Sequence, residues 1–147
     1  MNKLTAQIVL TTLGFLVCVG EASAQTPIVN EEAKLLPADG SSYDYFGYSV
    51  SISGNRALIG VYGDDDNGSN SGSAYVFNFD GSTWQEEAKL LPSDGASHEK
   101  FGISAAISGD TLVVGAYTDD DNGVSSGSAY IYRFDGSTWQ EEAKLLA

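Results

Sequence analysis

The chain has 147 residues, of which 42% are hydrophobic, and it carries a formal net charge of −13 at pH 7. With 7 Lys and Arg against 20 Asp and Glu, it lacks the clustered basic side chains that phosphate binding needs, so we expect no nucleic-acid partner. The same balance disfavours anionic membrane surfaces and suits an exported protein that binds cations.

The first 24 residues predict a secretory signal peptide. Lys3 precedes an apolar run at Ile8–Gly20, which is too short and wrongly flanked for a membrane span, and Ala22-Ser23-Ala24 is a small-residue cleavage signal. The single cysteine, Cys18, lies inside this segment. We therefore expect an exported chain that starts near Gln25, has no disulfide and no membrane span, and is secreted, periplasmic or at the cell surface.

The rest of the chain repeats itself. The sequence Glu31–Gly54 returns at Glu86–Gly109, which is an interval of 55 residues, and Trp84 and Trp139 keep the same interval. A third copy begins at Glu141. A repeat of this length indicates an array or a propeller, in which each unit buries its faces on its neighbours.

Each repeat predicts two strands in its first half. The first strand places Phe46, Tyr48, Val50 and Ile52 on one side, and this period of two predicts that their face is the more buried one. The second strand, Ala57–Tyr62, is apolar on both sides, as is its counterpart in the second repeat. It therefore predicts an inner strand that is covered on both faces.

Two more strands are predicted in the second half. The third strand covers Ser73–Phe79, a tight turn follows at Asp80-Gly81, and the fourth strand covers Thr83–Leu91. The second repeat has the same pattern at Ser128–Phe134 and from Thr138 onward.

Four strands in meander order form one propeller blade, so the predicted fold class is all-β. We expect two four-stranded antiparallel blades, at residues 46–91 and 101–147, after an N-terminal segment at 25–45 that holds one surplus strand, Ile28–Leu36. Two blades do not close a ring. The chain is therefore expected to be a fragment of a larger propeller, to be completed by several chains, or to stack with open edges that favour self-association.

Several spaced elements carry a family resemblance over nearly all of residues 31–146. Phe-Gly at 46–47 and 101–102 is followed by Gly-Val-Tyr or Gly-Ala-Tyr, by an acidic loop and by Ser-Gly-Ser-Ala-Tyr. This pattern resembles the FG-GAP repeat, the blade unit of integrin alpha chains and of many bacterial exported proteins. Tyr62 and Tyr117 stand where proline would be, which favours the bacterial form. The resemblance implies a seven-bladed parent propeller, calcium in inter-strand loops, and a role in adhesion or protein–protein contact.

The two acidic loops are the candidate metal sites. Calcium takes about six to eight oxygen ligands, and a bound dication would relieve the repulsion between adjacent carboxylates. Two or three side-chain ligands per loop predict weak affinity. An acidic, solvated turn is the alternative interpretation, and both stay open. The candidate ligands are Asp64, Asp65, Asp66, Asn67, Asp119, Asp120, Asp121 and Asn122.

The sequence gives little support for catalysis. His98 is the only histidine and lies in a polar loop where we expect it to be exposed, and no nucleophile elbow, phosphate loop or zinc spacing is present. We therefore predict an exported, non-catalytic module for adhesion or protein–protein interaction, with a protein or cell-surface ligand. Alternatives are a carbohydrate-binding module that uses Trp84 and Trp139, although packing between blades is the preferred role of both, and a non-catalytic part of a larger exported enzyme.

Overall fold

The computed structural model describes residues 31–147, and residues 32–147 form one compact unit. The predicted signal peptide and the beginning of the predicted surplus strand lie outside the described residues. All regular structure in the described part is β-strand. That part accordingly contains no helix able to cross a membrane.

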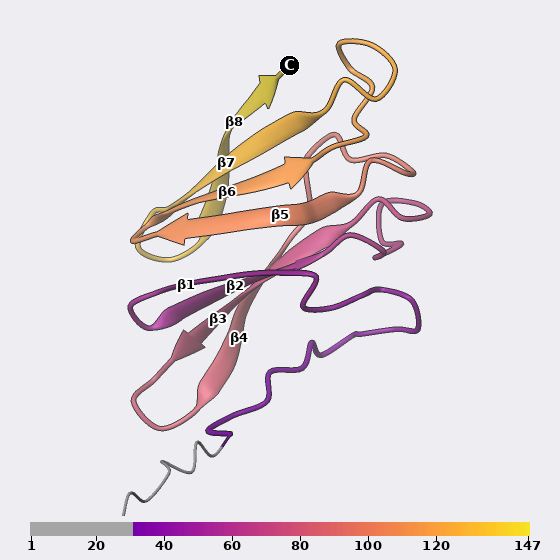
Figure 1. Cartoon of the computed structure of the whole chain (residues 1–147). Coiled ribbons are helices and arrows are strands. Elements are labelled where there is room, and N and C mark those ends of the chain that lie inside the picture. Colours follow the sequence, from indigo (N-terminus) through magenta and orange to yellow (C-terminus); the bar gives the residue numbers. More distant parts are fainter. Residues whose placement is uncertain (1–30) are drawn as a thin grey trace, which may run out of the picture. The chain divides into compact units, whose positions relative to one another are not determined.

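Eight strands form two antiparallel sheets, each in simple chain order. Figure 1 shows the two sheets as separate layers, and each sheet has four strands. The first sheet, blade 1, contains β1 (Ser49–Ser53), β2 (Arg56–Val61), β3 (Ser73–Phe79) and β4 (Trp84–Leu90). The second sheet, blade 2, contains β5 (Phe101–Ser108), β6 (Thr111–Ala116), β7 (Ser128–Phe134) and β8 (Trp139–Leu146). The predicted all-β architecture of two four-stranded blades is confirmed.

The hairpin between β3 and β4 shows why the strands end where the sequence predicted. Asp80 accepts hydrogen bonds from the backbone nitrogens of Ser82 and Thr83, each at 2.8 Å. These two bonds lower the pKa of Asp80 to about 2, and Gly81 supplies the positive φ of the turn. Asp135 makes the same turn between β7 and β8.

The two blades share a hydrophobic core. We call the face of blade 1 that packs on blade 2 the trailing face, and the opposite face the leading face. Each face of blade 2 takes the name of the blade 1 face to which it is equivalent in the repeat. Leu58 and Val76, on the trailing face of blade 1, are fully buried in a cluster with Phe101, Leu112 and Tyr130 of blade 2. Burial of one such aliphatic side chain stabilises the fold by about 1.5–3 kcal/mol.

The backbones of the two blades also approach closely. A Cβ placed at Gly102 would lie 2.2 Å from the carbonyl oxygen of Ser73, and one placed at Gly60 would lie 1.9 Å from the carbonyl oxygen of Gly102. The preceding residue, Phe101, donates its backbone N–H to the Ser71 carbonyl at 2.9 Å. The Phe-Gly pair of the second repeat therefore sits in the junction between the blades, where only glycine leaves room.

Two burial predictions were wrong, for one reason. In blade 1 the predicted buried face of β1 is open, with Tyr48, Val50 and Ile52 at 57%, 69% and 66% exposure, whereas the equivalent of Ile52, Ile107, is 8% exposed. Blade 1 covers Ile107, but no described element covers β1 in the same way. Likewise, β2 is covered on both faces as predicted, while β6 leaves Val113 exposed on the trailing face of blade 2.

The predicted surplus strand is not present in its described part. Residues 31–36 form no strand, although Leu35 packs against the cluster of Ile59, Tyr75 and Phe77 on the leading face of blade 1. The equivalent residues of the next repeat form β4, which pairs with β3. A strand at 31–36 would need a comparable neighbour, and the described part of the chain offers none.

Candidate functional site

The acidic loop between β2 and β3 folds on its own hydrogen bonds. The backbone nitrogen of Gly72 donates to the Asp64 carbonyl at 2.9 Å, and that of Ser71 donates to the Gly68 carbonyl at 3.0 Å. The loop between β6 and β7 repeats both bonds at 3.0 and 2.9 Å. The two loops therefore present the same backbone twice, once in each blade.

A lysine from the last strand of blade 1 reaches into this loop. The Nζ atom of Lys89 lies 2.9 Å from Asp64 Oδ2, 2.7 Å from Asp66 Oδ2 and 2.8 Å from Asp39 Oδ2. Asp39 comes from the connection that precedes the blade. Lys89 thus joins three separate segments: the connection, the β2–β3 loop and β4. We call this group the lysine clamp of blade 1.

Blade 2 contains the same clamp, one repeat later. Lys144 Nζ lies 2.7 Å from Asp119 Oδ2, 2.6 Å from Asp121 Oδ2 and 2.7 Å from Asp94 Oδ2. The agreement with blade 1 is close for both the residue types and the distances. The clamp is therefore part of the repeat.

Hydroxyl groups complete each clamp. Tyr75 donates to Asp39 Oδ1 at 2.6 Å, and Ser73 donates to Asp64 Oδ2 at 3.0 Å. Tyr130 in blade 2 donates in the same way to Asp94 Oδ1 at 2.8 Å. The carboxylates of the clamps thus have hydrogen-bond donors from the protein itself.

The clamps change the pKa values of their members. Burial opposes the charge of Lys89, but the carboxylates of Asp39, Asp66 and Asp64 outweigh it and raise the pKa of the lysine; the acids around Lys144 act in the same way. The hydrogen bond from Lys89, followed by the one from Tyr75, lowers the pKa of Asp39. The clamp of blade 1 therefore favours the charged forms of Lys89 and Asp39.

Only half of the predicted calcium ligands converge. Asp64 and Asp66 meet at the Lys89 ammonium, as Asp119 and Asp121 meet at Lys144. Asp65 instead accepts a bond from the backbone nitrogen of Asn70 at 2.7 Å. Asn67 turns away from the loop and donates to the Pro92 carbonyl at 3.2 Å. The counterparts in the second loop behave alike: Asp120 accepts from the Ser125 nitrogen, and Asn122 donates to the Ala147 carbonyl.

A calcium ion does not fit the residues in this arrangement. Calcium requires about six to eight oxygens at about 2.3–2.6 Å. The oxygens that converge in each loop already bind an ammonium, and within residues 31–147 no group of three or more acidic, histidine or cysteine side chains is arranged to hold a metal ion. Calcium binding at these loops stays a prediction.

Sequence reasoning missed four members of the clamps. These are Asp39 and Asp94, which were not among the candidate ligands, and Lys89 and Lys144, which lie in the predicted fourth strand of each repeat. One signal was available, because the EEAKLL segment supplies a lysine at the same place in each repeat of a strongly acidic chain.

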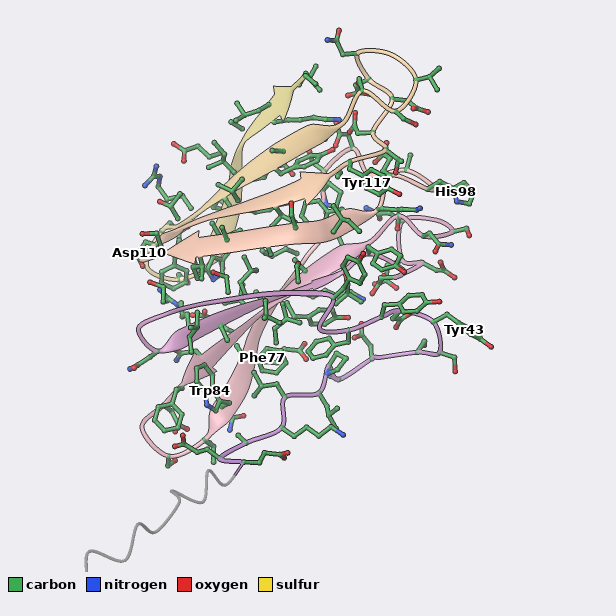
Figure 2. The ribbon with its side chains drawn as sticks, in the orientation of Figure 1. Tyr43, Phe77, Trp84, His98, Asp110 and Tyr117 are labelled. Atoms are coloured by element: carbon green, nitrogen blue, oxygen red, sulfur yellow. The ribbon has the colours of Figure 1, made fainter. Side chains whose placement is uncertain are left out.

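A patch of tyrosines at the loop end of the blades was also missed. Tyr45 stacks on Tyr62 with ring centroids 5.0 Å apart, and Tyr48 meets Tyr62 edge-on at 4.5 Å. The ammonium of Lys100 donates to the Tyr117 hydroxyl at 3.1 Å. We call these five residues the tyrosine patch. Figure 2 shows Tyr117 at this end, with His98 exposed beside it as predicted, and Asp110 at the opposite end.

Trp139 packs between the blades, as the preferred interpretation predicted. It is buried against Phe134, with ring centroids 5.3 Å apart, and its Nε1 donates to Glu87 Oε2 of blade 1 at 3.3 Å. It therefore presents no open ring for stacking on a sugar. Trp84 is half-buried against Phe79 and the leading-face cluster of blade 1.

The family model for the FG-GAP repeat matches the chain twice, at residues 29–77 and 84–132. The chain belongs to the FG-GAP repeat family. The first match covers β1, β2 and most of β3 of blade 1, and the second covers β4 of blade 1 followed by β5, β6 and most of β7 of blade 2. These FG-GAP repeats indicate a propeller-type module for protein interaction. No curated protein matches the chain.

Proposed function

We propose that this FG-GAP chain is an exported, non-catalytic module that binds another protein by blade-to-blade packing, and that its partner is a second copy of the chain. The observation that carries this proposal is an exposed apolar face whose repeat equivalent is a buried interface. The contact between blade 1 and blade 2 is the template for the proposed contact between copies.

The trailing face of blade 2 repeats the residues that blade 1 buries. Val113 and Leu145 are 38% and 53% exposed, whereas their equivalents, Leu58 and Leu90, are 0% and 5% exposed. Exposed apolar faces of this kind mark interaction surfaces. The members of this trailing face are Val113, Ala129, Ile131, Ala143 and Leu145.

The leading face of blade 1 is the complementary surface. Val50 and Ile52 are exposed there, while their equivalents in blade 2, Ala105 and Ile107, belong to the packed core between the blades. The chain thus carries both halves of an interface that it already makes once internally. Leu35, the repeat equivalent of Leu145, already packs on the leading face, so the partner's Leu145 would have to displace it. Because the two halves differ, copies would associate head to tail.

The backbone that would enter this interface is already in the required conformation. Tyr43 and Tyr45 have φ values of 74° and 59°, which match 73° and 58° at His98 and Lys100. In blade 2, His98 and Lys100 donate their backbone N–H groups to the loop carbonyls of Ser69 and Asn70 at 2.8 and 3.2 Å. Such preorganisation lowers the conformational cost of binding.

Head-to-tail association of two-blade copies has two outcomes. It closes into a ring if the rotation per copy allows, and otherwise it continues as a stack. Each copy adds two blades, and closed propellers have about four to eight blades.

A mixing experiment tests this proposal. Val113→Asp places a charge on the trailing face of blade 2, and Ile52→Asp places one on the leading face of blade 1. Each variant alone lacks one half of the interface and is expected to sediment as a monomer. An equimolar mixture is expected to form a dimer, because each variant keeps the half that the other lacks. Association of either variant alone at the wild-type level, or a mixture that stays monomeric, would overturn the proposal.

The tyrosine patch supports a second candidate function, adhesion to a cell-surface ligand. Exposed tyrosines are enriched at binding surfaces because they give a large contact area at low entropic cost. Glycan and protein arrays probed with wild type and with a Tyr62→Ser/Tyr117→Ser variant test it. Binding that the variant loses supports adhesion and identifies the ligand class. Equal binding by the variant excludes this patch.

A further inference from the structure

We infer that each blade supplies its own cation: the ammonium groups of Lys89 and Lys144 take the place of a metal ion in the acidic loops, so that both blades hold their loops without calcium. This inference is independent of the proposed association between copies. It follows from the geometry, the charge and the repetition of the lysine clamps.

The number of N–H groups on the ammonium matches the number of carboxylate oxygens close to it. An ammonium group has three N–H donors. Lys89 Nζ lies within 2.9 Å of one oxygen from each of Asp39, Asp64 and Asp66. The contacts to Asp39 and Asp66 are hydrogen bonds and the contact to Asp64 is an ion pair, and all three lie within the 2.7–2.9 Å expected of charge-assisted contacts.

The charge at the centre of each clamp explains why a cation is needed there. Asp64 and Asp119 are 3% and 0% exposed, and an unpaired carboxylate at such depth is strongly unfavourable. The lysine provides the counter-charge and cannot diffuse away. A calcium ion would have to displace the ammonium, which would then lose its three carboxylate partners.

The same arrangement around the lysine occurs in both blades, so it is not a chance contact. Three ion pairs occur in blade 1, and the equivalent three occur in blade 2 with distances of 2.6–2.7 Å. The tyrosine ring beside each ammonium also recurs, with Nζ 5.2 Å from the Tyr75 centroid and 5.1 Å from that of Tyr130. Both clamps therefore share one local structure.

The clamp of blade 2 also has a position that suits a structural cation. Asp94 lies in the connection that leads to His98, Lys100 and Phe101, whose backbone nitrogens bond to the loop of blade 1. By holding Asp94 to β8, Lys144 fixes the start of the segment that docks on the neighbouring blade. A metal ion in a blade loop would serve the same purpose, but here the protein side chain does so.

The test exchanges the clamp lysines for methionine, which is one heavy atom shorter, keeps an unbranched side chain and removes the charge. The proteins compared are wild type, Lys89→Met/Lys144→Met, and a Lys34→Met control at an exposed position outside both clamps. Each is melted with millimolar calcium and with chelator, and calcium binding is measured by calorimetry. Wild type and control should melt at the same temperature in both conditions. The double variant should melt lower in chelator, recover in calcium, and bind calcium at least about tenfold more tightly than wild type, which is about 1.4 kcal/mol.

Three results would overturn the inference. In the first, calcium stabilises wild type as much as it stabilises the double variant. In the second, wild type binds calcium more tightly than the double variant does. In the third, the double variant folds but its melting temperature does not respond to calcium. If the double variant does not fold, wild type alone decides. Terbium luminescence sensitised by Tyr75 and Tyr130 should be absent, and the ammonium ¹⁵N–H signals of two lysines should persist on addition of calcium. Sensitised luminescence or loss of those signals would show that the metal enters the loops.

Discussion

Gly102 and Gly47 have the same backbone φ, 89°, but different surroundings. A Cβ at Gly102 would lie 2.2 Å from the Ser73 carbonyl oxygen, while a Cβ at Gly47 would meet nothing within 4 Å. The two positions are equivalent in the repeat. Substituting alanine at each position therefore separates two effects. Both variants carry the strain of a non-glycine residue at positive φ, but only the Gly102 variant also disturbs the contact between the blades.

This pair gives the first prediction. Gly47→Ala should lower the free energy of unfolding by about 1 kcal/mol, which is the strain of a non-glycine residue at positive φ. Gly102→Ala carries the same strain and also pushes the blades apart, so its loss should be larger by at least about 2 kcal/mol. Urea unfolding of both variants at low protein concentration measures the difference. Equal losses would show that the blades can separate locally without cost.

Gly47→Ala makes a second prediction about association. In a head-to-tail contact Gly47 would take the crowded position that Gly102 has within the chain. The variant should therefore fold as a monomer and fail to associate. Unlike Ile52→Asp, it adds no charge to the leading face, so the loss would come from crowding alone. Sedimentation at several concentrations checks this, and association at the wild-type level would contradict it.

Arg56 provides the third prediction, because it links the blades at the end opposite the lysine clamps. Its guanidinium bonds Glu87 in a bidentate manner at 3.0 and 3.1 Å, reaches Asp110 of blade 2 at 2.9 Å and lies 4.0 Å above the Phe134 ring centroid. Arg56→Gln should cost about 1–3 kcal/mol of stability.

Arg133 is the matched control for Arg56. It pairs with Glu142 at 2.9 Å within blade 2, and its side chain is largely exposed. Arg133→Gln should therefore cost no more than about 1 kcal/mol. Chemical denaturation of both variants compares them, and an equal loss would show that the Arg56 link contributes nothing beyond a surface ion pair.

The clamps predict a dependence of stability on pH. The pKa values of Asp39, Asp94 and Asp119 are lowered below the reference value of 3.8 in the folded chain. A lowered acid pKa contributes stability above pH 3.8 that is lost as the pH falls through the folded value. The raised pKa values of Lys89 and Lys144 contribute stability below pH 10.5 that is lost at more alkaline pH.

The unfolding free energy should accordingly be flat between about pH 5 and 9 and fall on both sides. Lys89→Met/Lys144→Met should flatten the acid side, since its aspartates have lost the partner that lowers their pKa. Denaturation at a series of pH values measures this. If the unfolding free energy of the variant fell equally steeply at low pH, groups outside the clamps would be the cause of that fall.

The sequence predicted the strands better than their surroundings. Ser73–Phe79 and its counterpart were located correctly, because alternating aromatic residues and an Asp-Gly turn are local signals. Val50 and Ile52 were expected to be buried but are exposed, while Ile107 in the same pattern is buried. The difference depends on whether a neighbouring blade is present, and no local pattern contains that information.

The site was predicted only in part, for a similar physical reason. The acidic loops were recognised from their composition. The lysine clamp joins Asp39 and Lys89, which are 50 residues apart in sequence and meet only after β4 has paired with β3. Composition showed the need for a cation, and the tertiary fold determined which one is supplied.

Sedimentation velocity of the wild-type chain over a wide range of concentrations tests the central claim most directly. We expect species that grow in whole multiples of the chain as concentration rises, and a shift to monomer on Ile52→Asp substitution. A wild-type chain that stays monomeric at the highest concentration would contradict the claim that its exposed blade faces bind one another.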